Sequence, residues 1–251
     1  MMLQPFINLE FHGQIWKFII DYDMDRLFVE TRSAEGREVT FSSIDLNNGI
    51  TNFKDLVLPE KWLTGIAGSF RGTLFLHGYQ SAQSPAHKGI TAVDGKTGVT
   101  LWADYNNAIH HISINGPIVY NTQIQPKKLF LADAVTGSIL RPYDKLIDID
   151  QVPEIGIPDI INYIPKEFNL PEGQLTGNVH YFEHNSFRIV SLHLLNNSLL
   201  KQVLMISNGT EVVYDDLLNE GIQKLQPESF IVYQNRLIYI KNTTGLKVLN
   251  L

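Results

Sequence analysis

Two adjacent histidines, His110 and His111, come nearest in this chain to a metal or acid–base site. Imidazole nitrogens bind metals and exchange protons near neutral pH. Successive side chains of a β-strand point to opposite faces, so a strand through this pair would separate the two rings. We therefore expect one ring to face inward and the other to pack in the core, and we assign no metal site.

Acidic side chains gather in two stretches where acid–base chemistry can be considered. Hydrolysis of a glycosidic bond uses two carboxyl groups about 5–10 Å apart. The first stretch, 21–25, is expected to be a hairpin turn, where Asp is a good turn former. The second, within 141–176, lacks the glycine and glutamate of an EF-hand loop and is interpreted as a solvated loop. No catalytic residue is assigned among the residues concerned, which are Asp21, Asp23, Asp25, Asp144, Asp148, Asp150, Glu154 and Asp159.

Composition excludes several classes of function. The 251 residues include no cysteine, which rules out disulfides, thiolate zinc sites and cysteine nucleophiles. The net charge of −6 argues against a nucleic-acid binder, which needs a basic face. No apolar run approaches the roughly 18–20 residues of a membrane span, and the first residues lack the basic region of a signal peptide. We expect a cytoplasmic protein without a transmembrane segment, a metal or another cofactor.

A short phrase recurs in the chain and indicates how it is built. Residues 45–49 (Asp-Leu-Asn-Asn-Gly), 94–98 (Asp-Gly-Lys-Thr-Gly) and 133–137 (Asp-Ala-Val-Thr-Gly) each lie between apolar runs. The Asp side chain can accept hydrogen bonds from the amides that follow it, and Gly adopts positive φ at little cost, so the phrase predicts a tight turn. The copies are 49 and 39 residues apart, near the roughly 40–50 residues of a propeller blade.

The strand-like runs predict an all-β fold, a five-bladed β-propeller in a single domain. The last blade has room for only three strands, so we expect the N-terminal run 6–11 to supply the fourth and close the ring. A β-sandwich or two small β domains are the alternatives, and they explain the repeated turn less well. A long insertion separates blades three and four. The expected blades cover approximately 15–53, 63–102, 108–140, 177–214, and 228–251 with 6–11.

The stretch 92–102, Ala-Val-Asp-Gly-Lys-Thr-Gly-Val-Thr-Leu-Trp, resembles the quinoprotein-type (PQQ-type) propeller repeat. In that repeat the Asp and Thr brace the turn and the Trp packs between neighbouring blades. The stretch 131–137 matches the turn but has Leu140 near the Trp position, and 45–49 is followed by Phe53 there. The resemblance implies the blade fold. It does not imply the quinone, because those dehydrogenases are larger and use a cysteine pair, and the whole chain is more similar to a small uncharacterised bacterial propeller family.

The same resemblance predicts where the three tryptophans lie. We expect Trp16, Trp62 and Trp102 to pack between blades, with Trp62 partly exposed because it precedes a first strand.

Two segments depart most from the repeat, 78–88 and 141–176. Because strand direction alternates, both connections should emerge on one face, opposite the repeated turns. Loops on a rigid scaffold commonly carry binding, and the second connection exceeds the roughly 12–15 residues of an ordinary loop; alternatively, it only caps the channel. The candidate contacts on this face are Tyr79, Gln80, His87, Asp104, Tyr105, His110, Tyr143 and Tyr163.

The sequence favours a non-enzymatic binding or protein-interaction module and does not identify its ligand, which is a protein or a small molecule on the elaborated face. A carbohydrate-active hydrolase with carboxylates in the central channel is the alternative, and a purely structural scaffold is the third hypothesis. Carboxylates converging in a channel would favour the hydrolase, whereas an apolar or aromatic patch would favour a partner protein.

Overall fold

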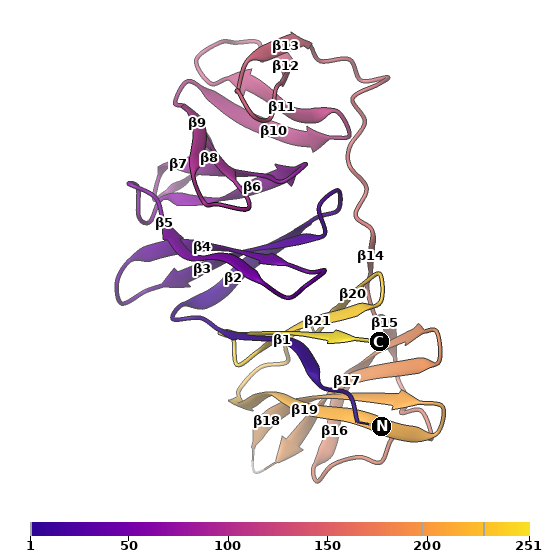
Figure 1. The fold of residues 1–251 in the computed structure, drawn as a ribbon. Coiled ribbons are helices and arrows are strands. Elements are labelled where there is room, and N and C mark those ends of the chain that lie inside the picture. The colour runs from indigo at the N-terminus through magenta and orange to yellow at the C-terminus, as the bar shows by residue number, and fades with distance from the viewer. Residues whose placement is uncertain (1, 197, 228) are drawn as a thin grey trace. The chain divides into compact units, whose positions relative to one another are not determined.

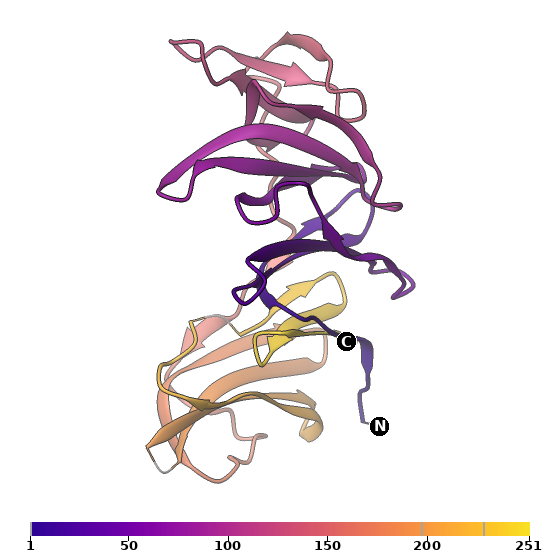
Figure 2. The ribbon, with the colours of Figure 1, turned by 90° about the vertical axis from the view of Figure 1, so that its left-hand side faces the viewer.

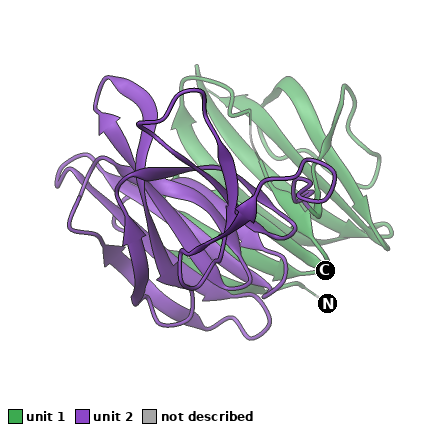
Figure 3. Cartoon of the chain, turned by 90° about the horizontal axis from the view of Figure 1, so that it is seen from above, with its two compact units in different colours: residues 1–11, 154–251 green, residues 12–153 purple. Residues whose placement is uncertain are grey.

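The computed structural model describes residues 2–196, 198–227 and 229–251, and in that part of the chain it contains strands and turns but no helix (Figure 1). The prediction of an all-β chain is confirmed. The strands form five antiparallel sheets. The chain divides into two compact units, one of residues 12–153 and the other of residues 1–11 with 154–251 (Figure 3). No helix in the described residues could cross a membrane, since none is present.

The 12–153 unit holds three four-stranded sheets, each with its strands in chain order. The first consists of β2 (Gln14–Asp21), β3 (Arg26–Ser33), β4 (Glu38–Asp45) and β5 (Thr51–Val57). The second consists of β6 (Thr64–Phe70), β7 (Thr73–Ser81), β8 (Ser84–Asp94) and β9 (Thr100–Asp104). The third consists of β10 (Asn107–Ser113), β11 (Gly116–Asn121), β12 (Leu129–Ala132) and β13 (Ile139–Pro142).

Apolar side chains fill the spaces between these three sheets. Phe28 and Phe41 of the first sheet pack with Leu74 of the second, and all three are fully buried. On its other side the second sheet contributes Phe75, which packs with Val119 of the third. One core therefore lies between the first and second sheets and another between the second and third. This layered packing lets the second sheet bury both of its faces.

The repeated phrase forms the predicted turn. The Asp94 carboxylate accepts hydrogen bonds from the amides of Lys96 and Thr97 at 3.0 and 2.7 Å, and Gly98 has a φ of +74°. A side chain on Gly98 would also meet the ring of Phe53, 3.2 Å from the ideal Cβ position. The glycine is thus required by its backbone conformation and by the aromatic side chain that the preceding sheet lays on the turn.

The tryptophans have different environments. Trp102 packs on the turn at Gly137, where an added Cβ would lie 2.7 Å from the indole, and its Nε1 donates to the carbonyl of Ala134 at 2.9 Å. This contact between the second and third sheets is the predicted one. Trp62 is half-buried against the core of the first two sheets. Trp16 was predicted to be core and is instead 66 % exposed, because it lies at a bulge in an edge strand.

The other unit holds two five-stranded sheets. One has the strand order β1–β22–β21–β20–β14 and the other runs in order from β15 to β19. The first consists of β1 (Pro5–Glu10), β14 (Ile155–Gly156), β20 (Ile231–Tyr233), β21 (Arg236–Lys241) and β22 (Gly245–Asn250). The second consists of β15 (Asp159–Ile161), β16 (Gln174–His184), β17 (Phe187–Asn196), β18 (Leu199–Asn208) and β19 (Glu211–Ile222). β1 pairs with β22, so the N-terminal run joins the last sheet as the sequence predicted.

The two departures from the repeat are more ordered than loops. Residues 78–88 extend β7 and β8 into a long two-stranded ribbon (Figure 2). The connection after β13 pairs with edge strands: the amide of Ile114 donates to the carbonyl of Ile149, β14 pairs with β20, and β15 pairs with β16. Such pairing protects strand edges that would otherwise be open.

Asp148 departs from the interpretation of this connection as a solvated acidic loop, whereas Asp144, Asp150, Glu154 and Asp159 are exposed. Its side chain is buried and accepts two hydrogen bonds from Arg141, at 2.6 and 2.5 Å, and one from Asn115 at 2.9 Å. These bonds, and one from the amide of Asp144, hold the pKa of the Asp148 carboxyl well below its usual range. Asp148 is a structural residue that fastens the connection to the third sheet.

Candidate functional site

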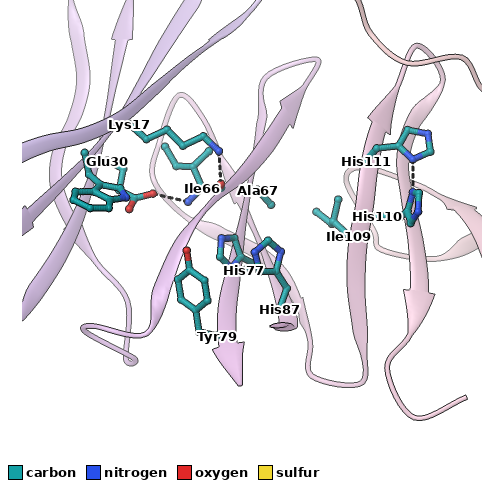
Figure 4. Close-up of a pocket in the computed structure, with 11 residues that line it drawn as sticks. Lys17, Glu30, Ile66, Ala67, His77, Tyr79, His87, Ile109, His110 and His111 are labelled. Atoms are coloured by element: carbon teal, nitrogen blue, oxygen red, sulfur yellow. Dashed lines mark hydrogen bonds between the residues drawn. The ribbon is translucent and has the colours of Figure 1, made fainter. Parts of the chain in front are cut away.

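A hollow of about 230 Å³ lies where the three sheets of the 12–153 unit present their first strands (Figure 4). The edge strands β2, β6 and β10 contact one another in that order, which brings their side chains to one place. The lining is rich in imidazole and other aromatic rings and includes one lysine and one carboxylate. The lining residues are Trp16, Lys17, Glu30, Ile66, Ala67, His77, Tyr79, His87, Ile109, His110 and His111.

A β-bulge occurs in each of the three edge strands and aims a residue at the hollow. The strand register shifts between Ile15 and Lys17, between Ile66 and Gly68, and between Ile109 and His111. The extra residues are Trp16, Ala67 and His110, and all three line the hollow. Bulges commonly redirect side chains beside functional sites, and here the same distortion is used in three sheets.

Three rings from the β7–β8 hairpin form one wall. His77 and His87 are stacked, with centroids 3.6 Å apart and planes 17° apart, and Tyr79 meets both rings edge-on. Burial and the neighbouring His87 lower the pKa of His77 to about 4, so this imidazole is neutral at physiological pH. Burial, then the charge of Lys17, also lowers the pKa of His87. The wall offers flat ring surfaces and the nitrogens of two imidazoles, of which His77 is neutral.

His110 and His111 lie on the opposite wall, and the prediction that they point apart is wrong. Their Nδ1 atoms are 2.7 Å apart, so one ring donates a hydrogen bond to the other. The bulge at His110 breaks the alternation of the strand, which is the physical reason for the difference. His111 Nε2 lies 3.4 Å from a carboxylate oxygen of Asp150. Burial, followed by the neighbouring His111, lowers the pKa of His110.

The charged side chains at the base of the hollow tie strands together. Glu30 accepts a hydrogen bond from the Ile66 amide at 2.8 Å and pairs with Arg32 at 2.7 Å. Arg32 in turn donates to the carbonyl of Thr64 at 2.9 Å. Lys17 donates to the carbonyl of Ile66, also at 2.9 Å. The single carboxylate of the lining is therefore committed to structural bonds.

Of the candidate residues predicted from the sequence, Tyr79, His87 and His110 line this hollow. The remaining five do not. Tyr143 meets His111 edge-on at 5.6 Å and borders a shallow surface depression. Asp104 accepts hydrogen bonds from the amides of Asn106 and Asn107 and serves as a turn cap. Tyr105 and Gln80 are exposed, and Tyr163 belongs to the other unit.

Four titratable lining residues were not singled out from the sequence as site residues: Lys17, Glu30, His77 and His111. A signal for two of them exists. The second strand of the first sheet begins Arg26-Leu-Phe-Val-Glu30, and the second strand of the second sheet begins Thr73-Leu-Phe-Leu-His77. In each strand a titratable residue directly follows three apolar residues. Both of these side chains are buried, which is uncommon for such groups unless they have partners.

A family model described as "Domain of unknown function (DUF4905)" matches residues 20–102, about a third of the chain. No curated protein matches. Among solved structures, the β-propeller domain of the Trilobed protease from Pyrococcus furiosus is 9 % identical, with 94 % of this chain and 64 % of that chain covered and a TM-score of 0.35. The GH43 BlXynB protein from Bacillus licheniformis is 8 % identical, with coverages of 99 % and 53 % and a TM-score of 0.33.

A third structure, a bifunctional GH43-CE protein from Bacteroides eggerthii, is 9 % identical, with coverages of 100 % and 35 % and a TM-score of 0.28. This chain thus spans between about one third and two thirds of the length of the structures to which it is similar. The neighbours are propeller-like, and at these identities and TM-scores they assign neither an activity nor a substrate.

Proposed function

We propose that this protein is a non-enzymatic binding module that takes a small polar ligand in the hollow of the 12–153 unit. One observation carries the proposal: three bulged edge strands and one extended hairpin converge on a single space and direct ring side chains into it. A scaffold that needed only stability would gain nothing from placing the buried His77 and three further histidines at such a point, because a buried polar group costs free energy unless it is bonded.

The chemistry of the walls suits a small molecule with hydrogen-bonding groups. Flat rings of Tyr79, His77 and His87 give contact area with little conformational entropy to lose, while imidazole and phenol groups give directional bonds. Trp16 stands exposed at the same space with the guanidinium of Arg32 5.3 Å from its ring centroid. The hollow is smaller than the roughly 300–1,000 Å³ of a drug-sized pocket, so the ligand is small or is bound in part.

The alternative of a carbohydrate-active hydrolase receives less support from this hollow. Its mechanism needs two carboxyl groups facing the substrate. Among the described residues that line the hollow, Glu30 is the only carboxylate, and it is bonded to Arg32 and to a backbone amide.

Binding can be tested with a panel of small compounds that includes inorganic anions, neutral sugars, nucleosides and amino acids. Tryptophan fluorescence reports on binding because Trp16 borders the hollow. A ligand of the hollow should bind Tyr79→Ala and His110→Ala at least about tenfold more weakly, the loss expected when one good contact is removed. His12→Asn, at an exposed position of the same unit, is the control and should bind normally. Binding that survives both hollow variants would refute the proposal.

We further propose that the five sheets are the blades of a five-bladed propeller of the quinoprotein-like type. The pairing of β1 with β22 supports this, because joining both termini in one sheet is the strand exchange that closes a ring. A compact chain of this length should have a radius of gyration near about 18 Å. Small-angle scattering that gives a clearly larger value would contradict closure.

A further inference from the structure

We propose that the ligand of this hollow is a small oxyanion, such as a carboxylate, phosphate or sulfate, and that the histidines take up a proton when it binds. The inference rests on the proposed function and adds the ligand class and its coupling to pH. It follows from which charges face the hollow and which of them are already neutralised.

The groups that face the site come from every element packed around it. On β2 and β3 the cations outnumber the anion, since Lys17 and Arg32 are opposed by Glu30 alone. The hairpin and β10 add imidazoles rather than carboxylates, and the nearest further carboxylate, Asp150, lies behind His111 and is 81 % exposed at its side chain. The titratable and charged groups are Lys17, Glu30, Arg32, His77, Tyr79, His87, His110, His111, Tyr120, Lys127, Tyr143 and Asp150.

Lys17 is the residue that gives the hollow its net positive charge. The Glu30 carboxylate is paired with Arg32, so those two charges cancel. Lys17 donates one hydrogen bond, to the carbonyl of Ile66, and an ammonium group has three donors. Lys17 and Tyr79 both line the hollow. An anion there would meet a cation and a hydroxyl donor, in a protein whose net charge is −6.

The imidazoles supply the coupling to pH. Burial lowers the pKa of His77, His87 and His110 and so favours their neutral forms, and the cation Lys17 lowers the pKa of His77 and His87 further. An oxyanion beside these rings reverses the balance, because it stabilises the imidazolium and satisfies its N–H groups. By thermodynamic linkage, a ligand that raises the pKa of a histidine must bind more tightly at lower pH.

Sulfate is the sharpest probe, because it stays a dianion across the pH range of interest and any pH dependence then belongs to the protein. The C2 proton resonances of the eight histidines report each pKa by NMR, with assignments made from His→Asn variants. With sulfate present we expect the pKa of His87 and of His110 to rise, whereas the resonance of the exposed His12 should not respond to sulfate. If binding takes up one proton, the affinity for sulfate should increase about tenfold for every unit by which the pH is lowered. Phosphate and malonate titrations then distinguish which oxyanion is preferred.

Two matched variants separate a site from general charge attraction. Lys17→Gln and Lys96→Gln remove the same charge, and Lys96 is exposed on the turn between β8 and β9. Lys17→Gln should weaken sulfate binding at least about tenfold, as loss of a charge-assisted hydrogen bond does, while Lys96→Gln should leave it unchanged. Thermal melts of both variants confirm that they are folded.

Each other outcome is informative. Equal weakening by the two lysine variants would reduce the effect to non-specific attraction and overturn the inference. Sulfate binding with no change in any histidine pKa would overturn the proton uptake. If the anions fail to bind while a neutral compound binds in a manner sensitive to Tyr79→Ala, the inference falls and the proposed function stands. If nothing binds the wild-type chain, both fall.

Discussion

The replacement of Trp102 by alanine tests how the second and third sheets are held together. The half-buried indole covers the turn at Gly137, donates from Nε1 to the Ala134 carbonyl at 2.9 Å, and lies 6.2 Å from the Phe75 ring centroid. Trp102→Ala removes all three contacts at once. It leaves the backbone of β9 in place, so the loss should be confined to this junction between sheets.

The size of the effect follows from these contacts. Complete burial makes a Trp→Ala replacement cost about 3–5 kcal/mol, and Trp102 is only half-buried. Roughly half of the burial term and about 1 kcal/mol for the lost hydrogen bond give a decrease of about 3 kcal/mol in the free energy of unfolding. For a chain of this length 1 kcal/mol corresponds to about 2–4 °C, so Tm should fall by about 6–12 °C.

Differential scanning calorimetry measures this change without relying on tryptophan emission. Trp102→Phe keeps a ring on the turn and loses the donor, so its Tm should fall by less than half as much. Trp16→Ala is the matched control, because Trp16 is 66 % exposed and its removal should shift Tm by about 2 °C or less. Equal shifts for Trp102→Ala and Trp16→Ala would refute the packing that we describe between these sheets.

The remaining predictions concern the termini and pH. Deleting residues 1–10 removes β1 and leaves β22 with an open edge, so Tm should fall by several degrees, and an unchanged Tm would show that the pairing contributes nothing. The pKa of Asp148 lies below its ordinary value because Arg141 donates to it, so its stabilising contribution is present above about pH 4 and is lost as pH falls through the lowered pKa. Urea unfolding at several pH values should show that Asp148→Asn lowers stability at neutral pH and weakens this acid dependence. Burial lowers the pKa of His77 from 6.5 to about 4, so that contribution is complete above about pH 6.5 and decreases as pH falls toward 4; His77→Gln should flatten the curve in that interval, and an unchanged slope would count against the buried neutral imidazole.

The repeated turns were predictable from the sequence because their signals are local. The hydrogen bonds of Asp94 reach only two and three residues ahead, and the positive φ of Gly98 belongs to the same turn. Neither depends on where the neighbouring sheets lie. The extra strands β14 and β15 were not predictable, since they are two and three residues long and form only because edge strands far along the chain accept them.

The site was harder to predict because it depends on exceptions to the same local rules. Alternation along a strand predicts that His110 and His111 point apart, and it fails where a bulge adds a residue. Alternation and composition equally mark Trp16 as core, and the bulge in β2 leaves it exposed. A bulge is set by the pairing register of two strands, which single-sequence patterns do not contain.

The three bulges also suggest how this scaffold separates stability from binding. The extra residue at a bulge has no place in the ladder, and at Trp16 and His110 it is exposed, whereas Ala67 also packs against the core between the second and third sheets. The bulged positions hold an indole, a methyl group and an imidazole in Trp16, Ala67 and His110, three side chains with nothing in common except their direction. His77 differs, because its buried ring is part of the core and its replacement carries a cost in packing. Substitutions at Trp16 and His110 should therefore change what the hollow binds before they change the stability of the sheets, whereas substitutions at His77 should change both.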